Sequence, residues 1–151
     1  MIPVSQLIFG DGKEGRPKGD CFRACVASIF ELAPEDVPHF TERESRWFSD
    51  FIEWLRPMGL TAEHVRGEPT ERPKSWPAGW WIASVRSENF EGETHAVVMR
   101  GYMTPFDGEN WTEVAHDPSP KPRRTPYVFV GGIRFAALDP AQIARAARRA
   151  P

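Results

Sequence analysis

The most informative part of the chain runs from Gly19 to Phe30 and reads GDCFRACVASIF. Its apolar residues recur at the three- and four-residue spacing of a helix with one buried face. They are Phe22, Cys25, Val26, Ile29 and Phe30. Gly19 adds a flexible residue and Asp20 an N-cap before this pattern, and Pro34 stops it. We therefore predict a helix whose first turn holds Cys21.

The segments on either side of this helix predict one strand and one further helix. Before it, Val4–Phe9 alternates loosely and is typical of a short strand that ends at the turn Gly10-Asp11-Gly12. After it, Thr41–Glu44 matches a capping box, which predicts the start of a second helix. The apolar stripe of that helix comprises Trp47, Phe48, Phe51, Ile52 and Leu55. Pro57 with Gly59 closes it.

Most of the remaining chain predicts β-strands. They fall at Leu60–Val65, Trp80–Val85, Thr94–Arg100, Trp111–His116 and Tyr127–Ala136, the last interrupted by Gly131-Gly132. Asp139-Pro140 then opens a terminal helix rich in Ala and Arg. Helices that precede strands indicate an α+β fold, with N-terminal helices packed on a mostly antiparallel sheet. We expect the 151 residues to form a single domain, residues 1–151.

Composition narrows the class of protein. Hydrophobic residues make up 40% of the chain and aromatic residues 12%, which excludes a disordered chain. No stretch is apolar for long enough to span a membrane, and the first residues lack the basic and apolar regions of a signal peptide. Two cysteines are too few for a disulfide scaffold. We expect a soluble, cytoplasmic protein.

The charge of the chain argues against nucleic acid as its partner. The formal net charge is −2, so the molecule as a whole does not favour polyanions. Basic residues gather toward the C-terminal end, at Lys121, Arg123, Arg124, Arg134, Arg145, Arg148 and Arg149. A solvated helix face explains such a run better than nucleic-acid binding does, although docking of an acidic partner stays open.

Three residues form a pattern that suits nucleophilic catalysis. Cys21 lies in the first turn of its helix, where the helix dipole and free N–H groups favour a thiolate. Cys25, one turn further on, is expected in the core. His95 opens a predicted strand and is suited to act as the base for a thiol. Asp117 ends the next predicted strand, so in an antiparallel pair it lies beside His95 and orients the ring.

Three short motifs carry a family resemblance: Gly19-Asp20-Cys21 before an apolar helix, His95 opening a Val-rich strand, and Asp117-Pro118 closing the next. Their order resembles the papain-like cysteine peptidase superfamily, in particular its compact bacteriocin-processing type. A similar pattern occurs among small proteins of bacteria and their phages. The resemblance spans residues 6–118 and implies a papain-like fold, a Cys-His-Asp triad and no cofactor. It also implies a cysteine peptidase, isopeptidase or amidase that works through a thioester and takes a peptide or protein substrate.

One part of the family pattern is missing at its usual place. Such peptidases commonly carry a Gln several residues before the Cys, and its side chain joins the Cys backbone N–H in an oxyanion hole. Residues 14–20 contain no Gln, so the role falls to Gln6 on the predicted first strand. The Asp20 carboxylate is either the helix N-cap or a charge that opposes the thiolate, and the second case would favour loss of activity.

Other interpretations stay open. A catalytically inactive papain-like scaffold would bind a protein partner through aromatic residues that include Trp76, Trp80 and Trp81. An amine acceptor in place of water would make the protein an acyltransferase of the transglutaminase kind. Cys21 and Cys25 with two histidines are nominally a Cys₂His₂ metal set, but their spacing does not match that of a zinc site.

The same residues also have purely structural interpretations. Cys21 would then be a structural thiol, His95 an edge-strand residue without a role, and Asp117 the start of an Asp-Pro turn. Of the other histidines, His116 should point to the face opposite Asp117. His39 and His64 have no evident partner in the sequence pattern.

Overall fold

The computed structural model describes residues 1–43, 45–71, 78–103 and 110–138, and within them the fold is α+β. Two α-helices, α1 (Cys21–Phe30) and α2 (Trp47–Leu55), precede the strands. Three 3₁₀ turns join them to each other and to the sheet: η1 (Pro34–Asp36), η2 (Phe40–Glu42) and η3 (Arg56–Met58). The helix predicted from Asp139 and the side chain of Trp76 lie outside the described residues.

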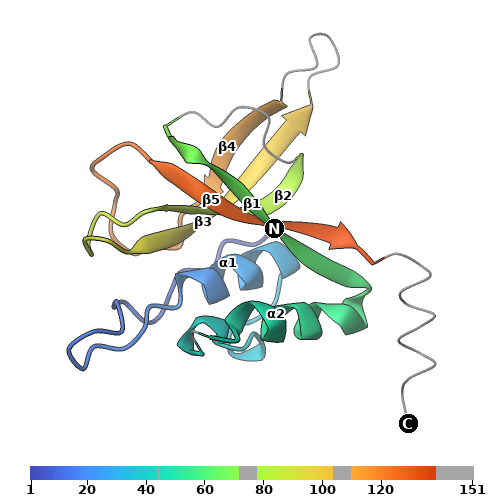
Figure 1. The fold of residues 1–151 in the computed structure, drawn as a ribbon, viewed down its shortest axis with the longest axis horizontal. Coiled ribbons are helices and arrows are strands. Elements are labelled where there is room, and N and C mark those ends of the chain that lie inside the picture. Colours follow the sequence, from blue (N-terminus) through green and yellow to red (C-terminus); the bar gives the residue numbers. More distant parts are fainter. Residues whose placement is uncertain (44, 72–77, 104–109, 139–151) are drawn as a thin grey trace.

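The five strands form one antiparallel sheet in the order β1-β5-β2-β3-β4. Their bounds are β1 Leu60–Thr70, β2 Gly79–Arg86, β3 Thr94–Met103, β4 Asn110–His116 and β5 Phe129–Ala137. Both helices lie on the same face of this sheet (Figure 1). The five strands predicted after residue 59 and the arrangement of helices on an antiparallel sheet are therefore confirmed.

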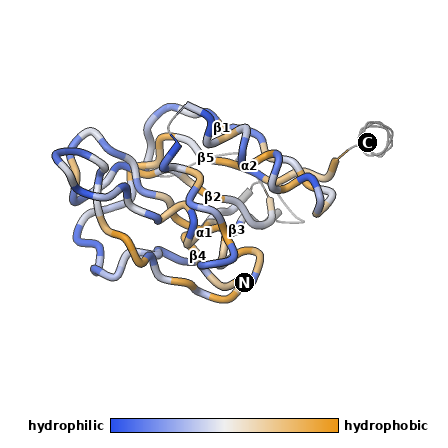
Figure 2. The backbone as a smooth tube through the Cα atoms, turned by 90° about the horizontal axis from the view of Figure 1, so that it is seen from below, coloured by the Kyte–Doolittle hydropathy of each residue, from blue (hydrophilic) through white to orange (hydrophobic). Residues whose placement is uncertain are grey.

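The core is divided between the two faces of the sheet, because successive strand residues point to opposite sides. The larger cluster lies between sheet and helices and includes Phe22, Phe51 and Ile82. A smaller cluster around Trp81 lies on the other side of β2, among Ala83, Val85, Val97, Met99 and Phe129. Figure 2 shows hydrophobic stretches in the middle of the molecule and hydrophilic ones along the loops at its left.

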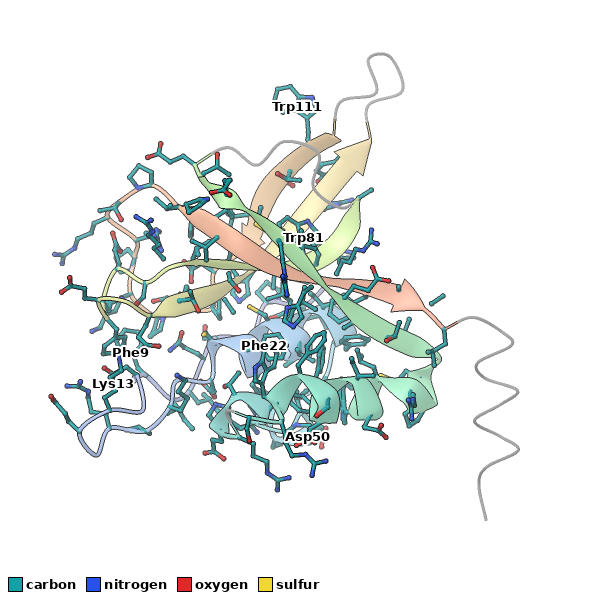
Figure 3. The ribbon with its side chains drawn as sticks, viewed as in Figure 1. Phe9, Lys13, Phe22, Asp50, Trp81 and Trp111 are labelled. Carbon is teal, nitrogen blue, oxygen red and sulfur yellow. The ribbon has the colours of Figure 1, made fainter. Side chains whose placement is uncertain are left out.

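The two adjacent tryptophans of β2 have different surroundings. Trp81 is fully buried, so it is unavailable to a partner, whereas Trp80 is half-buried and carries the Arg100 guanidinium over its ring. Phe22 lies between α1 and α2, and Trp111 projects from the sheet with 62% of its surface exposed (Figure 3). Neither α-helix of the described residues is long and apolar enough to span a membrane.

Two local predictions are wrong. Val4–Phe9 forms no strand. The segment is bonded along α1, from Val4 N to Ser28 Oγ at 2.9 Å and from Ile8 N to Asp20 Oδ1 at 2.9 Å, and Gln6 N donates to Pro118 O at 2.9 Å. Thr41 does not cap α2, which begins at Trp47, but lies in η2. The reason is Phe40, which is only 5% exposed and packs on Phe22 and Phe51. Burying this ring outweighs the local capping preference of the sequence.

β5 runs continuously through Gly131-Gly132, but the register of its pairing with both β1 and β2 shifts between Phe129 and Gly131, so the expected interruption is a local irregularity and not a break. Gly132 pairs with Ala83 of β2 inside the ladder. A Cβ atom on Gly132 would lie 2.5 Å from Ile82 O and 2.9 Å from the Trp81 ring. The sequence therefore places glycine here because the β2 backbone and the buried Trp81 ring come too close for any side chain.

Candidate active site

A glycine-bounded loop delivers the chain to the start of α1. Gly19 N donates to Gly10 O at 2.9 Å, and the backbones of Asp11 and Lys18 form an isolated antiparallel β-bridge across the loop. A Cβ atom on Gly10 would lie 2.1 Å from Pro17 O, so the two arms of the loop approach closely only without a side chain there. His39 Nε2 lies 3.2 Å from Gly19 O and fixes the last residue of the loop.

Cys21 is the first residue of α1 and is partly buried. Its Sγ accepts a hydrogen bond from Ala96 N of β3 at 3.4 Å. Its own backbone N–H is one of the donors at a helix start that have no carbonyl partner within the helix. Cys25, by contrast, is fully buried, and burial raises the pKa of its thiol well above the ordinary value. The two cysteines are thus in different environments, as predicted.

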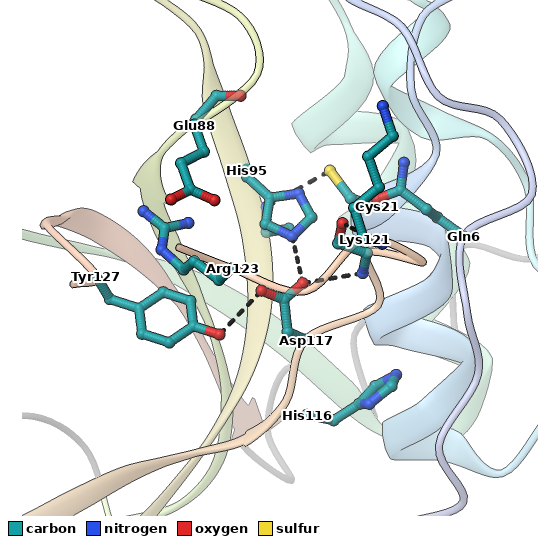
Figure 4. A network of polar contacts seen from close by, with 12 residues as sticks. Gln6, Cys21, Glu88, His95, His116, Asp117, Lys121, Arg123 and Tyr127 are labelled. Carbon is teal, nitrogen blue, oxygen red and sulfur yellow. Dashed lines mark hydrogen bonds and ion pairs between the residues drawn. The ribbon is translucent and has the colours of Figure 1, made fainter. Parts of the chain in front are cut away.

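His95 lies between Cys21 and Asp117 (Figure 4). Its Nε2 is 2.7 Å from Asp117 Oδ1, and its other ring nitrogen, Nδ1, faces Cys21 Sγ. Burial lowers the pKa of His95, but hydrogen bonds to Asp117 and Cys21 outweigh it and raise this pKa to about 9. The pocket therefore favours the imidazolium form of His95.

Asp117 is held by three donors. Besides His95, the backbone N–H of Ser119 and the hydroxyl of Tyr127 each donate to its carboxylate at 2.9 Å. Burial opposes its ionisation, yet these bonds lower the pKa of Asp117 below its usual value. Burial and the bond to Asp117 also raise the pKa of Tyr127 to about 12. Asp117 is thus a fixed carboxylate, and Tyr127 acts only as a donor.

Gln6 lies in the same pocket as Cys21 and is 8% exposed. Its Nε2 donates one hydrogen to Ile8 O at 3.0 Å, which leaves the second hydrogen for another acceptor. Its Oε1 is buried without a hydrogen-bond partner among the described residues. The backbone N–H of Gln6 donates to Pro118 O, so the Gln6 backbone is tied to the loop that carries Asp117.

Asp20 fixes the segment that carries Gln6. The side chain of Asp20 does not cap α1, although the residue holds the N-cap position. Its buried Oδ1 accepts hydrogen bonds from Leu7 N at 3.0 Å and Ile8 N at 2.9 Å. His116 holds the same segment, because its Nε2 lies 2.8 Å from Val4 O. Asp20 therefore holds the predicted N-cap position of α1, but its carboxylate accepts from two N–H groups of the N-terminal segment instead of from the helix.

A pocket of about 180 Å³ opens beside these residues. The 10–19 loop, the β2–β3 turn and the loop after β4 surround it, and Cys21, His95 and Asp117 all line it. Ile82, Ile133, Phe22 and Trp47 form an apolar part of its wall. Cys21, His95 and Asp117 therefore face a space large enough for a small side chain to enter.

Several functional contacts were not visible in the sequence. The sequence pattern places Tyr127 in a predicted strand, and nothing in that pattern indicates that its hydroxyl bonds Asp117. The Ala96 N–H and the Ser119 N–H are backbone groups, which no motif identifies. His39 has Gly19 O as its partner, and His64 packs on Phe48 with ring centroids 3.9 Å apart. Among the described residues, which include every Cys and His, no group of three or more metal-ligating side chains lies together.

Comparison of the chain with models of known protein families, with curated proteins and with solved structures found no significant match.

Proposed function

We propose that this protein is a papain-like cysteine hydrolase that cleaves peptide, isopeptide or other amide bonds through a thioester intermediate. The observation that carries the proposal is the position of His95, which is shared between Cys21 and Asp117 at the wall of an open pocket. A partly buried histidine held in this way has a fixed ring orientation and one nitrogen directed at a thiol. The α+β fold and the order Cys, His, Asp along the chain also support it.

Acylation begins with attack of the Cys21 thiolate on the substrate carbonyl carbon. The S–C bond forms, the carbonyl π electrons move onto oxygen, and a tetrahedral oxyanion results. The free N–H of Cys21 and the remaining Nε2 hydrogen of Gln6 are the donors available to this oxyanion. The His95 imidazolium then gives its Nδ1 proton to the leaving amine, the C–N bond breaks, and a thioester remains on Cys21.

Deacylation uses the same groups in reverse. Neutral His95 takes a proton from water, and the resulting hydroxide attacks the thioester carbonyl. The C–S bond breaks, a carboxylic acid leaves, and the thiolate–imidazolium pair is restored. Asp117 keeps the ring oriented in both half-reactions through Nε2. An amine in place of water would give acyl transfer by identical steps.

Trapping of the acyl-enzyme tests this proposal directly. The full-length protein is mixed with p-nitrophenyl acetate, quenched in acid and analysed by peptide mass spectrometry. We expect acetyl groups on Cys21 in the wild type, none there in His95→Ala, and none on Cys25, which is buried and serves as an internal control. Acetylation confined to surface lysines, with no signal on Cys21, would contradict the proposed function.

A further inference from the structure

The carboxylates that line the pocket already have positive or amide partners. Asp11 receives two bonds from Arg16, at 2.8 and 2.9 Å, which lower the pKa of Asp11 to about 2. Glu93 lies 2.6 Å from Lys13 Nζ, and this contact lowers the pKa of Glu93. Glu88 accepts hydrogen bonds from the backbone of residues 124 and 125. The acidic side chains of the pocket wall are therefore not free to attract a cationic substrate.

Three basic side chains line the pocket, and two of them, Arg123 and Lys18, have partners within the protein. Arg123 donates to Thr125 O at 2.9 Å and to Arg86 O at 3.1 Å, and it stacks on the Tyr127 ring. Lys18 Nζ lies 3.6 Å from Glu93. These contacts hold both side chains to the protein itself.

Lys121 differs from these two cations. Its Nζ lies over the Phe9 ring, 4.4 Å from the centroid, and no carboxylate of the described residues comes within ion-pair distance of it. Its backbone N–H donates to Ser119 Oγ at 3.2 Å, two residues after Asp117. Lys121 lines the same pocket as Cys21 and Gln6, and Figure 4 draws the three side chains in one view. An ammonium group without a counter-ion thus stands at the mouth of the site.

The ring under this ammonium group belongs to an aromatic pair. Phe9 and Phe90 have centroids 5.3 Å apart, and both line the pocket. A ring face attracts a cation and also packs well against methylene groups. The pair therefore offers an apolar surface for a short aliphatic chain directly below a positive charge.

We propose that Lys121 binds a carboxylate of the substrate, so that the preferred substrates are amides with a carboxylate close to the bond that is cleaved. This inference rests on the proposed function. The carboxylate forms an ion pair with Nζ of Lys121, and the adjoining methylene groups pack on Phe9 and Phe90. Either an acidic side chain or a free C-terminal carboxylate supplies this chemistry.

Two alkylating reagents of nearly equal size test the charge preference without a known substrate. Iodoacetate carries a carboxylate and iodoacetamide is neutral. The iodoacetate rate at Cys21 is divided by the iodoacetamide rate, and this ratio is then divided by the same ratio measured for the free thiol N-acetylcysteine amide. We expect Lys121→Gln to lower this ratio by about two- to fivefold, the range for an exposed ion pair. Lys121→Arg keeps the ratio, and so does Arg124→Gln, a control outside the pocket lining. An unchanged ratio in Lys121→Gln would overturn the inference.

Competition with short peptides then identifies the source of the carboxylate. Three acetylated tripeptides are compared for protection of Cys21 from iodoacetamide: one with a central Glu and an amidated end, one with Gln and an amidated end, and one with Gln and a free carboxyl end. Protection by the first beyond the second supports an acidic side chain, and protection by the third supports a terminal carboxylate. Equal protection by all three would overturn the inference.

These tests distinguish failure of the carboxylate preference from failure of the proposed function. If His95→Ala leaves the iodoacetamide rate of Cys21 unchanged, the proposed function itself fails. If His95→Ala lowers that rate but Lys121→Gln leaves the iodoacetate ratio unchanged, only the carboxylate preference fails. The imidazolium of His95 attracts iodoacetate in every Lys121 variant alike, so comparison among these variants isolates the contribution of Lys121.

Discussion

His95 Nε2 lies 2.7 Å from Asp117 Oδ1, and the two residues come from opposite ends of neighbouring antiparallel strands. His95 is the second residue of β3, and Asp117 directly follows β4. In an antiparallel pair the start of one strand lies beside the end of the other, so the sheet itself sets this contact. Cys21 reaches the same place from the start of α1.

The raised pKa of His95 predicts a pH-dependent stability. A group whose pKa rises from 6.5 to about 9 on folding stabilises the native state fully below 6.5. This contribution, on the order of 3 kcal/mol, is lost as the pH rises through about 9. We expect the free energy of urea unfolding of the wild type to fall between pH 6.5 and about pH 9, and this fall to be absent in His95→Ala. Equal pH profiles for the two proteins would contradict the ion pair.

Tyr127 is predicted to act as a positioning residue. Tyr127→Phe removes the 2.9 Å bond to Asp117 but leaves the donors His95 and Ser119 in place. Because a hydrogen bond to a charged group contributes about 1.5–3 kcal/mol, we expect the acylation rate of Cys21 to fall about tenfold. The matched control is Tyr102→Phe, whose hydroxyl bonds the exposed Glu113 on the sheet. If both variants acylate at the wild-type rate, Tyr127 does not position Asp117.

Gln6 should affect acyl chemistry and leave simple alkylation intact. Attack on a carbonyl creates an oxyanion that needs donors, whereas displacement of iodide from iodoacetamide creates none. We expect Gln6→Ala to slow acetylation of Cys21 by p-nitrophenyl acetate about 100-fold, within the range seen when one oxyanion donor is removed. Its iodoacetamide rate should stay within about twofold of the wild type. Equal loss of both reactions would indicate a general disturbance of the site and not an oxyanion donor.

Two substitutions separate the possible roles of Asp20. Asp20→Ala leaves Leu7 N and Ile8 N without their acceptor, so we expect a loss of about 2 kcal/mol or more in unfolding free energy. Asp20→Asn keeps an oxygen acceptor and removes the negative charge beside the start of α1. Its Cys21 alkylation should therefore be at least as fast as in the wild type, measured at the same pH. Slower alkylation in Asp20→Asn would show that the charge itself supports the site.

Part of the candidate site could be predicted from the sequence, because these residues lie in helices and strands or directly beside them. The helical spacing around Cys25, the strand pattern that contains His95 and the one that ends just before Asp117 are local, and antiparallel pairing brings His95 and Asp117 together. The fold class followed for the same reason. The papain-like family stays a proposal, supported by the order of these elements.

The remaining contacts depend on tertiary packing, which the local sequence does not encode. Val4–Phe9 has an alternating pattern, yet its N–H groups bond to Asp20 and Pro118 instead of to a strand. Thr41 lies in a turn because Phe40 is buried. Tyr127 reaches Asp117 only because the loop after β4 turns back toward β5.

Activation of Cys21 by His95 can be measured through the pH dependence of Cys21 alkylation by iodoacetamide. Peptide mass spectrometry follows Cys21 and the buried Cys25 in the same sample, with Cys21→Ser as the blank. We expect rapid labelling of Cys21 well below about pH 8, where an ordinary thiol reacts slowly, and much slower labelling in His95→Ala. Labelling of Cys21 with the pH profile of an ordinary thiol, unchanged in His95→Ala, would contradict this activation.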